Sequence, residues 1–129
     1  MTATDTVRRL YDAFASGDGE ALGYLLGETH WIEAAGGPYG GTYRGFGEVA
    51  ANVFGPIGTD VQNFTAIPDD LLAIGDDRVL SLGTYRGTTA AGPLAVRFAH
   101  LFTVVGDRIS HVEQFTDTHQ WREAVGSAS

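Results

Sequence analysis

The sequence contains no cysteine and no lysine, so all eight of its basic residues are arginines. Without cysteine the chain cannot form disulfides, thiolate nucleophiles or cysteine-based metal sites. Without lysine it cannot form a Schiff base with a carbonyl substrate, and it lacks the lysine of a phosphate-binding P-loop. These two absences exclude several large classes of enzyme mechanism.

Long apolar runs and positive charge are also scarce. No run approaches the roughly 18 apolar residues of a membrane span, and the first ten residues lack the order of a signal peptide. We therefore predict a cytoplasmic protein with no membrane partner. The formal net charge is −8, which opposes binding to a phosphate backbone, and the arginines are scattered. We predict no nucleic-acid partner.

The composition is that of one folded domain. The chain has 129 residues, of which 43% are hydrophobic and 11% aromatic, as in globular rather than disordered proteins. A chain of this length can bury roughly two-thirds of its unfolded surface. Since no linker, repeat or low-complexity segment divides the sequence, we predict a single domain over residues 1–129.

Three helices are predicted in the first half of the chain. An apolar stripe at helical spacing indicates the first helix, which ends at SGDG, 16–19. A short second helix follows, capped by Asp18. The third runs from Phe46 to Phe54 and ends at Gly55-Pro56. The stripe of the first helix consists of Val7, Leu10, Tyr11 and Phe14.

Strand patterns follow the helices. HWIEA, 30–34, reads as a strand with Trp31 and Glu33 on one face, and the glycine-rich stretch 34–45 reads as a loop. From Val61 onward, long alternating segments separated by turns indicate an antiparallel meander. This order predicts an α+β fold with helices packed on one face of an antiparallel sheet.

The last predicted hairpin, FAHLFTVVGDRISHVEQFTDTHQW at 98–121, carries titratable groups beside phenylalanines. A two-residue turn at Gly106-Asp107 pairs Val105 with Arg108. In that register His100 lies opposite Glu113. A one-residue bulge would change which side chains face the core. Without a bulge, one face carries Phe98, His100, Phe102, Glu113, Phe115 and Asp117.

Such a face fits a pocket better than a solid core. Burying an unpaired carboxylate costs several kcal/mol or raises its pKa, and a pKa raised toward neutrality suits a general base. We therefore predict Asp117 and His100 as catalytic residues, although about 13 Å of strand separates them. The alternatives are that Asp117 caps a C-terminal helical turn, and that His100 is only a satisfied, half-buried histidine.

Glu33 is a third catalytic candidate. It follows Trp31 on the first strand and precedes the glycine-rich loop, where a base could reach a cavity mouth; the alternative is a surface carboxylate. The four histidines show no spacing typical of a metal site, so we predict no metal. The residues predicted to bind substrate along the pocket wall are Trp31, Tyr43, Phe54, Tyr85, Phe98, Phe102 and Phe115.

The order of the segments VRRLYDAFASGD, WIEAAGGPYGGTYRG, GDDRVLSLGTYRG and FAHLFTVVGDRISHVEQFTDT resembles a known family. It is similar to the SnoaL-like, ketosteroid isomerase-related branch of the NTF2-like superfamily, over roughly residues 5–122. The resemblance implies a cone of three N-terminal helices packed on a strongly curved antiparallel sheet that encloses an apolar pocket. It also implies a homodimer.

The resemblance also assigns roles to individual positions. Ketosteroid isomerases carry an oxyanion tyrosine on the first helix and a protonated aspartate on a later strand; alignment puts Leu10 and Ala99 there, which predicts that this oxyanion hole is missing. The alignment puts Glu33 close to their catalytic base. SnoaL-like cyclases use an aspartate on the last strand with a histidine on its neighbour, which Asp117 and His100 match.

The function implied is cofactor-independent acid–base chemistry by an isomerase, aldol-type cyclase or dehydratase. The substrate would be a small hydrophobic carbonyl or polyketide-like compound. Asp117 would abstract or shuttle a proton, His100 would polarise the carbonyl oxygen, and Glu33 would assist from the pocket mouth. The alternatives are a non-catalytic protein that binds a hydrophobic ligand, and an epoxide hydrolase.

Overall fold

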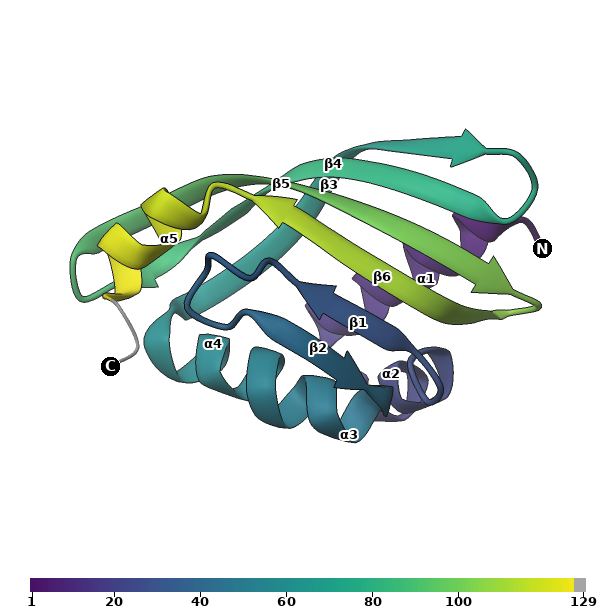
Figure 1. Cartoon of the computed structure of the whole chain (residues 1–129), viewed down its shortest axis with the longest axis horizontal. Coiled ribbons are helices and arrows are strands. Elements are labelled where there is room, and N and C mark those ends of the chain that lie inside the picture. Colours follow the sequence, from purple (N-terminus) through teal and green to yellow (C-terminus); the bar gives the residue numbers. More distant parts are fainter. Residues whose placement is uncertain (127–129) are drawn as a thin grey trace.

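The computed structural model describes residues 1–126. One six-stranded sheet curves around the helices (Figure 1) and has the strand order β2-β1-β6-β5-β4-β3. All neighbouring strands are antiparallel except β1 and β6, which run parallel. The strands are β1 (His30–Glu33), β2 (Gly41–Arg44), β3 (Gln62–Ile74), β4 (Arg78–Thr89), β5 (Gly92–Val105) and β6 (Arg108–Thr116).

The helices precede most of the sheet in the chain, so the predicted α+β architecture is confirmed. No helix among residues 1–126 is both long and apolar enough to cross a membrane. The helical elements are α1 (Ala3–Ser16), α2 (Gly19–Leu25), α3 (Gly45–Val49), the π-helical turn η1 (Ala50–Phe54), α4 (Gly55–Asp60) and α5 (Thr118–Val125).

Helix α1 has clear signals at both ends. Thr2 and Asp5 form a capping box in which each side chain accepts a hydrogen bond from the other residue's backbone N–H. Gly17 ends the helix in the left-handed conformation, with φ 68°. Between these caps, the buried residues Val7, Leu10 and Tyr11 turn one face of α1 toward the sheet.

The third predicted helix does not end at Gly55-Pro56, and that part of the prediction is wrong. The helical path continues from α3 through η1 into α4 and reaches Asp60. The backbone N–H of Gly55 bonds to the carbonyl of Ala50, five residues back. Pro56 follows the π-helical turn directly, and this local change of hydrogen-bonding pattern accommodates a residue that has no backbone N–H to donate.

A bulge at Ser110 changes the register of the last hairpin. Val105 pairs with Arg108 as predicted, but the register shifts between Thr103 and Val104, and beyond this point His100 pairs with Gln114. The predicted pairing of His100 with Glu113 is therefore wrong. Because side chains alternate along a strand, one extra residue turns the rest of β6 over.

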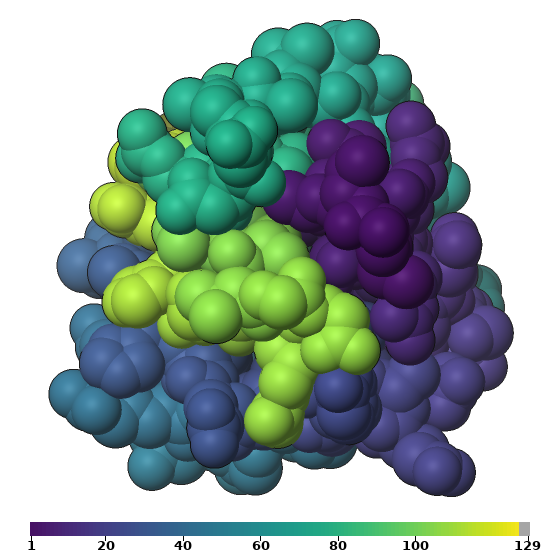
Figure 2. All heavy atoms as spheres, turned by 90° about the vertical axis from the view of Figure 1, so that its right-hand side faces the viewer, coloured from purple at the N-terminus to yellow at the C-terminus, as the bar shows by residue number. Residues whose placement is uncertain are grey.

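The core lies between the inner face of the sheet and the helices. Helix α1 contacts β3, β4, β5 and β6, and its first residues pack beside the β3–β4 and β5–β6 hairpins at one end of the molecule (Figure 2). The largest fully buried side chains include Trp121, Phe102 and Leu25. Behind α1, the inner face of the sheet is not completely filled.

Candidate active site

A cavity lies between α1, the α3–η1–α4 segment and the inner face of the sheet. The empty space is about 470 Å³ when its open mouth is included, and the centre of a water molecule can reach about 40 Å³ of it. The second of these volumes is the one to compare with small-molecule pockets, and it is far below their roughly 300–1,000 Å³. The cavity is lined by Leu10, Tyr11, Phe14, Trp31, Glu33, Val53, Phe54, Ile57, Phe64, Ala66, Tyr85 and His100.

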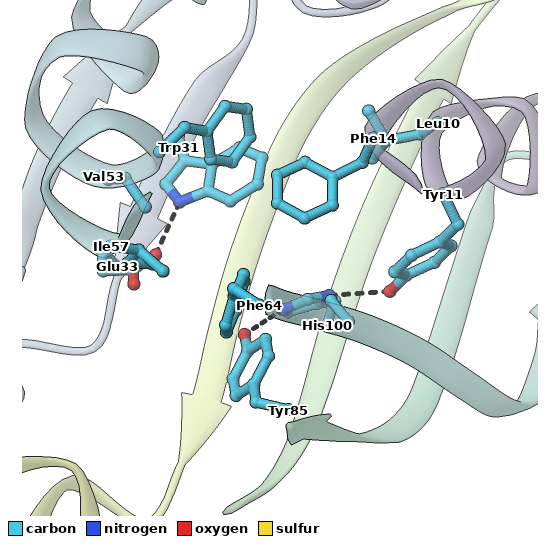
Figure 3. A pocket seen from close by; sticks show the side chains of 12 residues that line it. Leu10, Tyr11, Phe14, Trp31, Glu33, Val53, Ile57, Phe64, Tyr85 and His100 are labelled. Atoms are coloured by element: carbon cyan, nitrogen blue, oxygen red, sulfur yellow. Dashed lines mark hydrogen bonds between the residues drawn. The ribbon is translucent and has the colours of Figure 1, made fainter. Parts of the chain in front are cut away.

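His100 stands between two tyrosines that line the same cavity (Figure 3). Its Nδ1 lies 2.7 Å from the hydroxyl of Tyr11, which comes from α1. Its Nε2 lies 2.6 Å from the hydroxyl of Tyr85, which comes from β4. Burial lowers the pKa of His100 to about 3, so the imidazole is neutral at physiological pH and has one donor and one acceptor nitrogen.

The tyrosine hydroxyls have further partners. Tyr11 lies 2.5 Å from Oγ of Ser81, and Tyr85 accepts a hydrogen bond of 2.9 Å from Nε2 of Gln114. Burial raises the pKa of both phenols, so both stay protonated and can serve as hydrogen-bond donors. Ser81 and Gln114 are themselves buried.

Glu33 is the carboxyl group of the cavity. It is 4% exposed, and its Oε1 accepts a hydrogen bond of 2.8 Å from the indole Nε1 of Trp31. Burial raises the pKa of Glu33 to about 7, while hydrogen bonds from Trp31 and Gln114 act in the opposite direction. A carboxyl with a pKa near neutrality can both take up and release a proton under physiological conditions.

The two groups occupy different parts of the cavity wall. Glu33 and Trp31 lie on one side of the space drawn in Figure 3, and His100 with its two tyrosines lies on the other. None of the twelve lining residues is an arginine. The site therefore combines a titratable carboxyl with neutral donors in apolar surroundings.

Asp117 is not among the residues that line the cavity. Its exposed carboxylate accepts a hydrogen bond of 3.0 Å from the backbone N–H of Gln120 and caps α5. The bulge at Ser110 also turns Phe115 outward, where it is 49% exposed, and Glu113 faces outward beside it. The predicted shared face of His100 with these three residues is wrong, and the structure agrees with the capping alternative for Asp117.

The other predicted wall residues divide into three groups. Trp31, Phe54 and Tyr85 line the cavity as predicted. Phe98 and Phe102 lie behind the lining: Phe98 stacks on His100 with ring centroids 4.3 Å apart, and Phe102 meets Tyr11 edge-on. Tyr43 belongs to the glycine-rich region, where its hydroxyl donates to the backbone carbonyl oxygens of Tyr39 and Gly40.

Sequence reasoning missed Tyr11, Ser81 and Gln114. Tyr11 of α1 and His100 of β5 bond to each other in the cavity wall. Each stands one position after the residue that the alignment matched to the oxyanion hole, Leu10 and Ala99. Tyr11 of the first helix thus lines the cavity beside Leu10, the residue that the alignment had matched to the oxyanion tyrosine. The sequence did contain a signal for Tyr11, which is a tyrosine within an apolar helical stripe. Because a buried phenol usually has a hydrogen-bond partner, such a tyrosine indicates a polar group inside the fold.

Within residues 1–126, no three histidine, aspartate or glutamate side chains cluster as a metal site would require. Arg97 on β5 is exposed and pairs with Asp69 and Thr84 outside the cavity. The cavity therefore has one carboxyl group, Glu33, as its candidate base.

Comparisons with known proteins place this geometry in context. The family model of the SnoaL-like domain matches residues 7–112. An NTF2-like protein from Burkholderia thailandensis is 34% identical, with a TM-score of 0.87 over 96% of this chain and 97% of that chain. An NTF2-like protein from Burkholderia pseudomallei is 27% identical, with a TM-score of 0.85 over 98% and 100%.

A third structure shows the same fold at lower identity. TerC, co-crystallised with polyporic acid, is 22% identical, with a TM-score of 0.84 over 97% of this chain and 98% of that chain. No curated protein matches the sequence. The predicted cone fold is confirmed by these structures.

Proposed function

The chain belongs to the SnoaL-like family of NTF2-like proteins, and from that premise we propose that it is an acid–base enzyme that needs no cofactor. It would move a proton at a carbon next to the carbonyl of a small hydrophobic compound. One observation carries the proposal: a buried carboxyl with a pKa of about 7 and a histidine-bridged pair of phenols line one apolar cavity.

The reaction begins at Glu33. Its carboxylate takes a proton from the carbon beside the carbonyl, the C–H electron pair forms a C=C bond, and the carbonyl π electrons move to oxygen. The hydroxyl of Tyr11 or Tyr85 donates a hydrogen bond to the resulting enolate oxygen. Donors placed where charge develops stabilise the transition state, and the base contributes on the order of 10² to 10⁴ in rate.

The enolate has three possible outcomes. Return of the proton from Glu33 to a different carbon isomerises the substrate. Attack of the enolate carbon on a second carbonyl of the same molecule closes a ring. Loss of the hydroxyl group from the neighbouring carbon, which takes the proton from Glu33 and leaves as water, dehydrates the molecule. All three begin with the same proton transfer, so the site supports the class of reaction before the product is known.

The lining also restricts the substrate. Aromatic and aliphatic side chains form most of the wall, and none of the lining residues is an arginine that could neutralise an anionic group. The ionised Glu33 would repel such a group. We therefore propose an uncharged substrate with one carbonyl oxygen that reaches the tyrosines and an apolar body in contact with Phe14, Phe54 and Phe64.

A non-catalytic binding protein is the second candidate. One observation favours it: His100, Tyr11 and Tyr85 already satisfy one another, and the centre of a water molecule reaches only about 40 Å³ of the cavity. A ligand would have to displace side chains and compete for these hydrogen bonds. In this case the protein would bind an apolar compound and leave it unchanged.

Hydrogen exchange at carbon distinguishes the two candidates. The protein is incubated in D₂O with a panel of apolar ketones and β-keto esters, and loss of the α-proton NMR signal is followed. The proposal predicts exchange that Glu33→Gln abolishes, while the matched control Glu113→Gln, on the outer face, retains it. Asp117→Asn is expected to retain it as well. Exchange that persists in Glu33→Gln would exclude Glu33 as the base.

The outer face of the sheet supports a separate proposal on assembly. Phe115 is 49% exposed and Ile32 is 39% exposed, and on the same face Ile32 and Leu101 flank Glu113. Exposed apolar patches of this kind mark interaction surfaces. We propose that a second copy of the chain covers this face and forms a homodimer. Light scattering after size exclusion should give a dimer mass that Phe115→Arg converts to a monomer; a wild-type monomer at micromolar concentration would exclude it.

A further inference from the structure

We propose that Ser81 is a positioning residue that, together with Gln114, holds His100 as the Nδ1–H tautomer. The tautomer is inferred from the hydrogen bonds of the free protein, and only its effect on catalysis rests on the proposed function. The inference concerns six hydrogen bonds in a continuous chain, from the backbone N–H of Ala34 to the carbonyl oxygen of His100.

Gln114 sets the donor-to-acceptor direction of the hydrogen bonds in this chain. Its Oε1 accepts a hydrogen bond of 3.0 Å from the backbone N–H of Ala34, which can only donate. This contact orients the amide, so Nε2 faces Tyr85 and donates to its oxygen at 2.9 Å. Gln114 therefore cannot accept the proton of the Tyr85 hydroxyl. The bulge at Ser110 is what turns Gln114 inward.

The proton of Tyr85 must then find another acceptor. Within the part of the chain that the structure describes, Nε2 of His100 is the acceptor within reach, at 2.6 Å. A neutral imidazole that accepts at Nε2 carries its proton on Nδ1. That proton points to the oxygen of Tyr11 at 2.7 Å. The Nε2–H tautomer would leave the Tyr85 hydroxyl as an unpaired buried donor, which is unfavourable.

Ser81 completes the chain at its other end. Because Tyr11 accepts from Nδ1–H, its own proton is free to go to Oγ of Ser81 at 2.5 Å. The proton of Ser81 goes to the carbonyl oxygen of His100 at 3.4 Å. Every donor in the group is used once in this direction. Without Ser81 the Tyr11 proton would turn toward Nδ1 and favour the opposite tautomer.

The tautomer decides which phenol can serve a ligand. Tyr11 can turn its proton from Ser81 to a ligand oxygen while it still accepts from His100. Tyr85 can donate to a ligand only if it gives up its hydrogen bond to Nε2 of His100. All the bonds then point from Gln114 toward the ligand, and aligned hydrogen bonds strengthen one another. Gln114 also keeps the pKa of Glu33 lower than burial alone would set it.

The tautomer can be measured in the free protein. Histidine labelled with ¹⁵N shows from the couplings of the ring carbon-bound hydrogens which nitrogen carries the proton, and His100→Gln assigns the signals. We expect only the Nδ1–H form in the wild type near pH 7. Ser81→Ala, a small change at a buried site, should give a mixture of the two tautomers. Ser16→Ala, at the exposed C-terminal end of α1, is the control and should match the wild type.

Three outcomes would overturn the proposal. These are an Nε2–H tautomer in the wild type, an unchanged Nδ1–H tautomer in Ser81→Ala, and a mixture in Ser16→Ala as well. The spectra require no substrate. Failure of the proposed enzyme activity would therefore leave this result intact, and an overturned tautomer would leave Glu33 as the candidate base.

Discussion

The indole nitrogen of Trp31 donates a hydrogen bond of 2.8 Å to Oε1 of Glu33, two residues further along the same short strand. This bond stabilises the carboxylate, whereas burial destabilises it. Burial has the larger effect, so the pKa of Glu33 rises to about 7. A tryptophan two positions before the base therefore limits how far burial can raise that pKa.

The pH dependence of exchange follows from this balance. Glu33 must be ionised to accept a proton, so we expect the exchange rate to rise about tenfold per pH unit below a midpoint near 7 and then to level off. Trp31→Phe removes the stabilising hydrogen bond and should move the midpoint to higher pH. Glu113→Gln should leave it in place. A rate that does not change between pH 5 and 9 would contradict the assignment of Glu33.

Stability should depend on pH through the same carboxyl. The folded protein keeps the proton of Glu33 up to a pKa of about 7, whereas the unfolded chain releases it near 4.5. Between these values the folded state binds more protons, so stability falls as pH rises, by about 3 kcal/mol at most. Urea unfolding of wild type and Glu33→Gln at pH 5 and pH 8 isolates this effect, since both contain His100. An equal change in stability between pH 5 and pH 8 in the two proteins would contradict this prediction.

The two phenols of the site should differ in importance. Tyr11→Phe removes the hydroxyl that can turn to a ligand oxygen, so kcat should fall on the order of 10² to 10³, as for loss of an oxyanion donor. Tyr85→Phe removes a group that acts through His100, and its loss should be clearly smaller. Rates of exchange at saturating ketone measure both. Equal losses would argue against a distinct role for Tyr11.

Asp117 should matter for stability and not for exchange. It accepts the backbone N–H of Gln120 at the start of α5, and loss of such a cap destabilises a protein by about 1 kcal/mol. We expect this loss in Asp117→Ala and little change in Asp117→Asn, because asparagine also caps helices well. Chemical denaturation gives the stability. An exchange rate that falls in both variants would return Asp117 to the catalytic candidates.

Gly83 is required for the packing behind the site. A Cβ atom there would lie 2.4 Å from the carbonyl oxygen of Ile67 and 2.5 Å from Cζ of Phe98, the ring that stacks on His100. Gly83→Ala should therefore destabilise the fold by about 1 to 3 kcal/mol. Gly58→Ala, in α4 with nothing within 4 Å, is the control and should be neutral or stabilising by about 0.4 to 1 kcal/mol. A neutral Gly83→Ala would show that both the Phe98 ring and the backbone at Ile67 can move.

Sequence patterns predicted local placement well where no irregularity intervened. The alternation in β1 correctly put Trp31 and Glu33 on one face, and the helical stripe put Tyr11 on the buried face of α1. The same alternation failed on β6, because nothing in RISHVEQ distinguishes a strand with a bulge at Ser110 from one without. Because of this one extra residue, Gln114 lies on the inner face of the sheet in the place predicted for Glu113.

The sequence by itself determined the α+β class, the amphipathic faces of α1 and β1, and the absence of thiol and Schiff-base chemistry, because these depend on composition and short-range periodicity. Only the tertiary structure decided which polar groups meet. Tyr11 and His100 are 89 residues apart in the chain, and their contact depends on how α1 crosses the sheet. A hydrogen bond needs its atoms placed within a few tenths of an ångström, and periodicity cannot supply that precision.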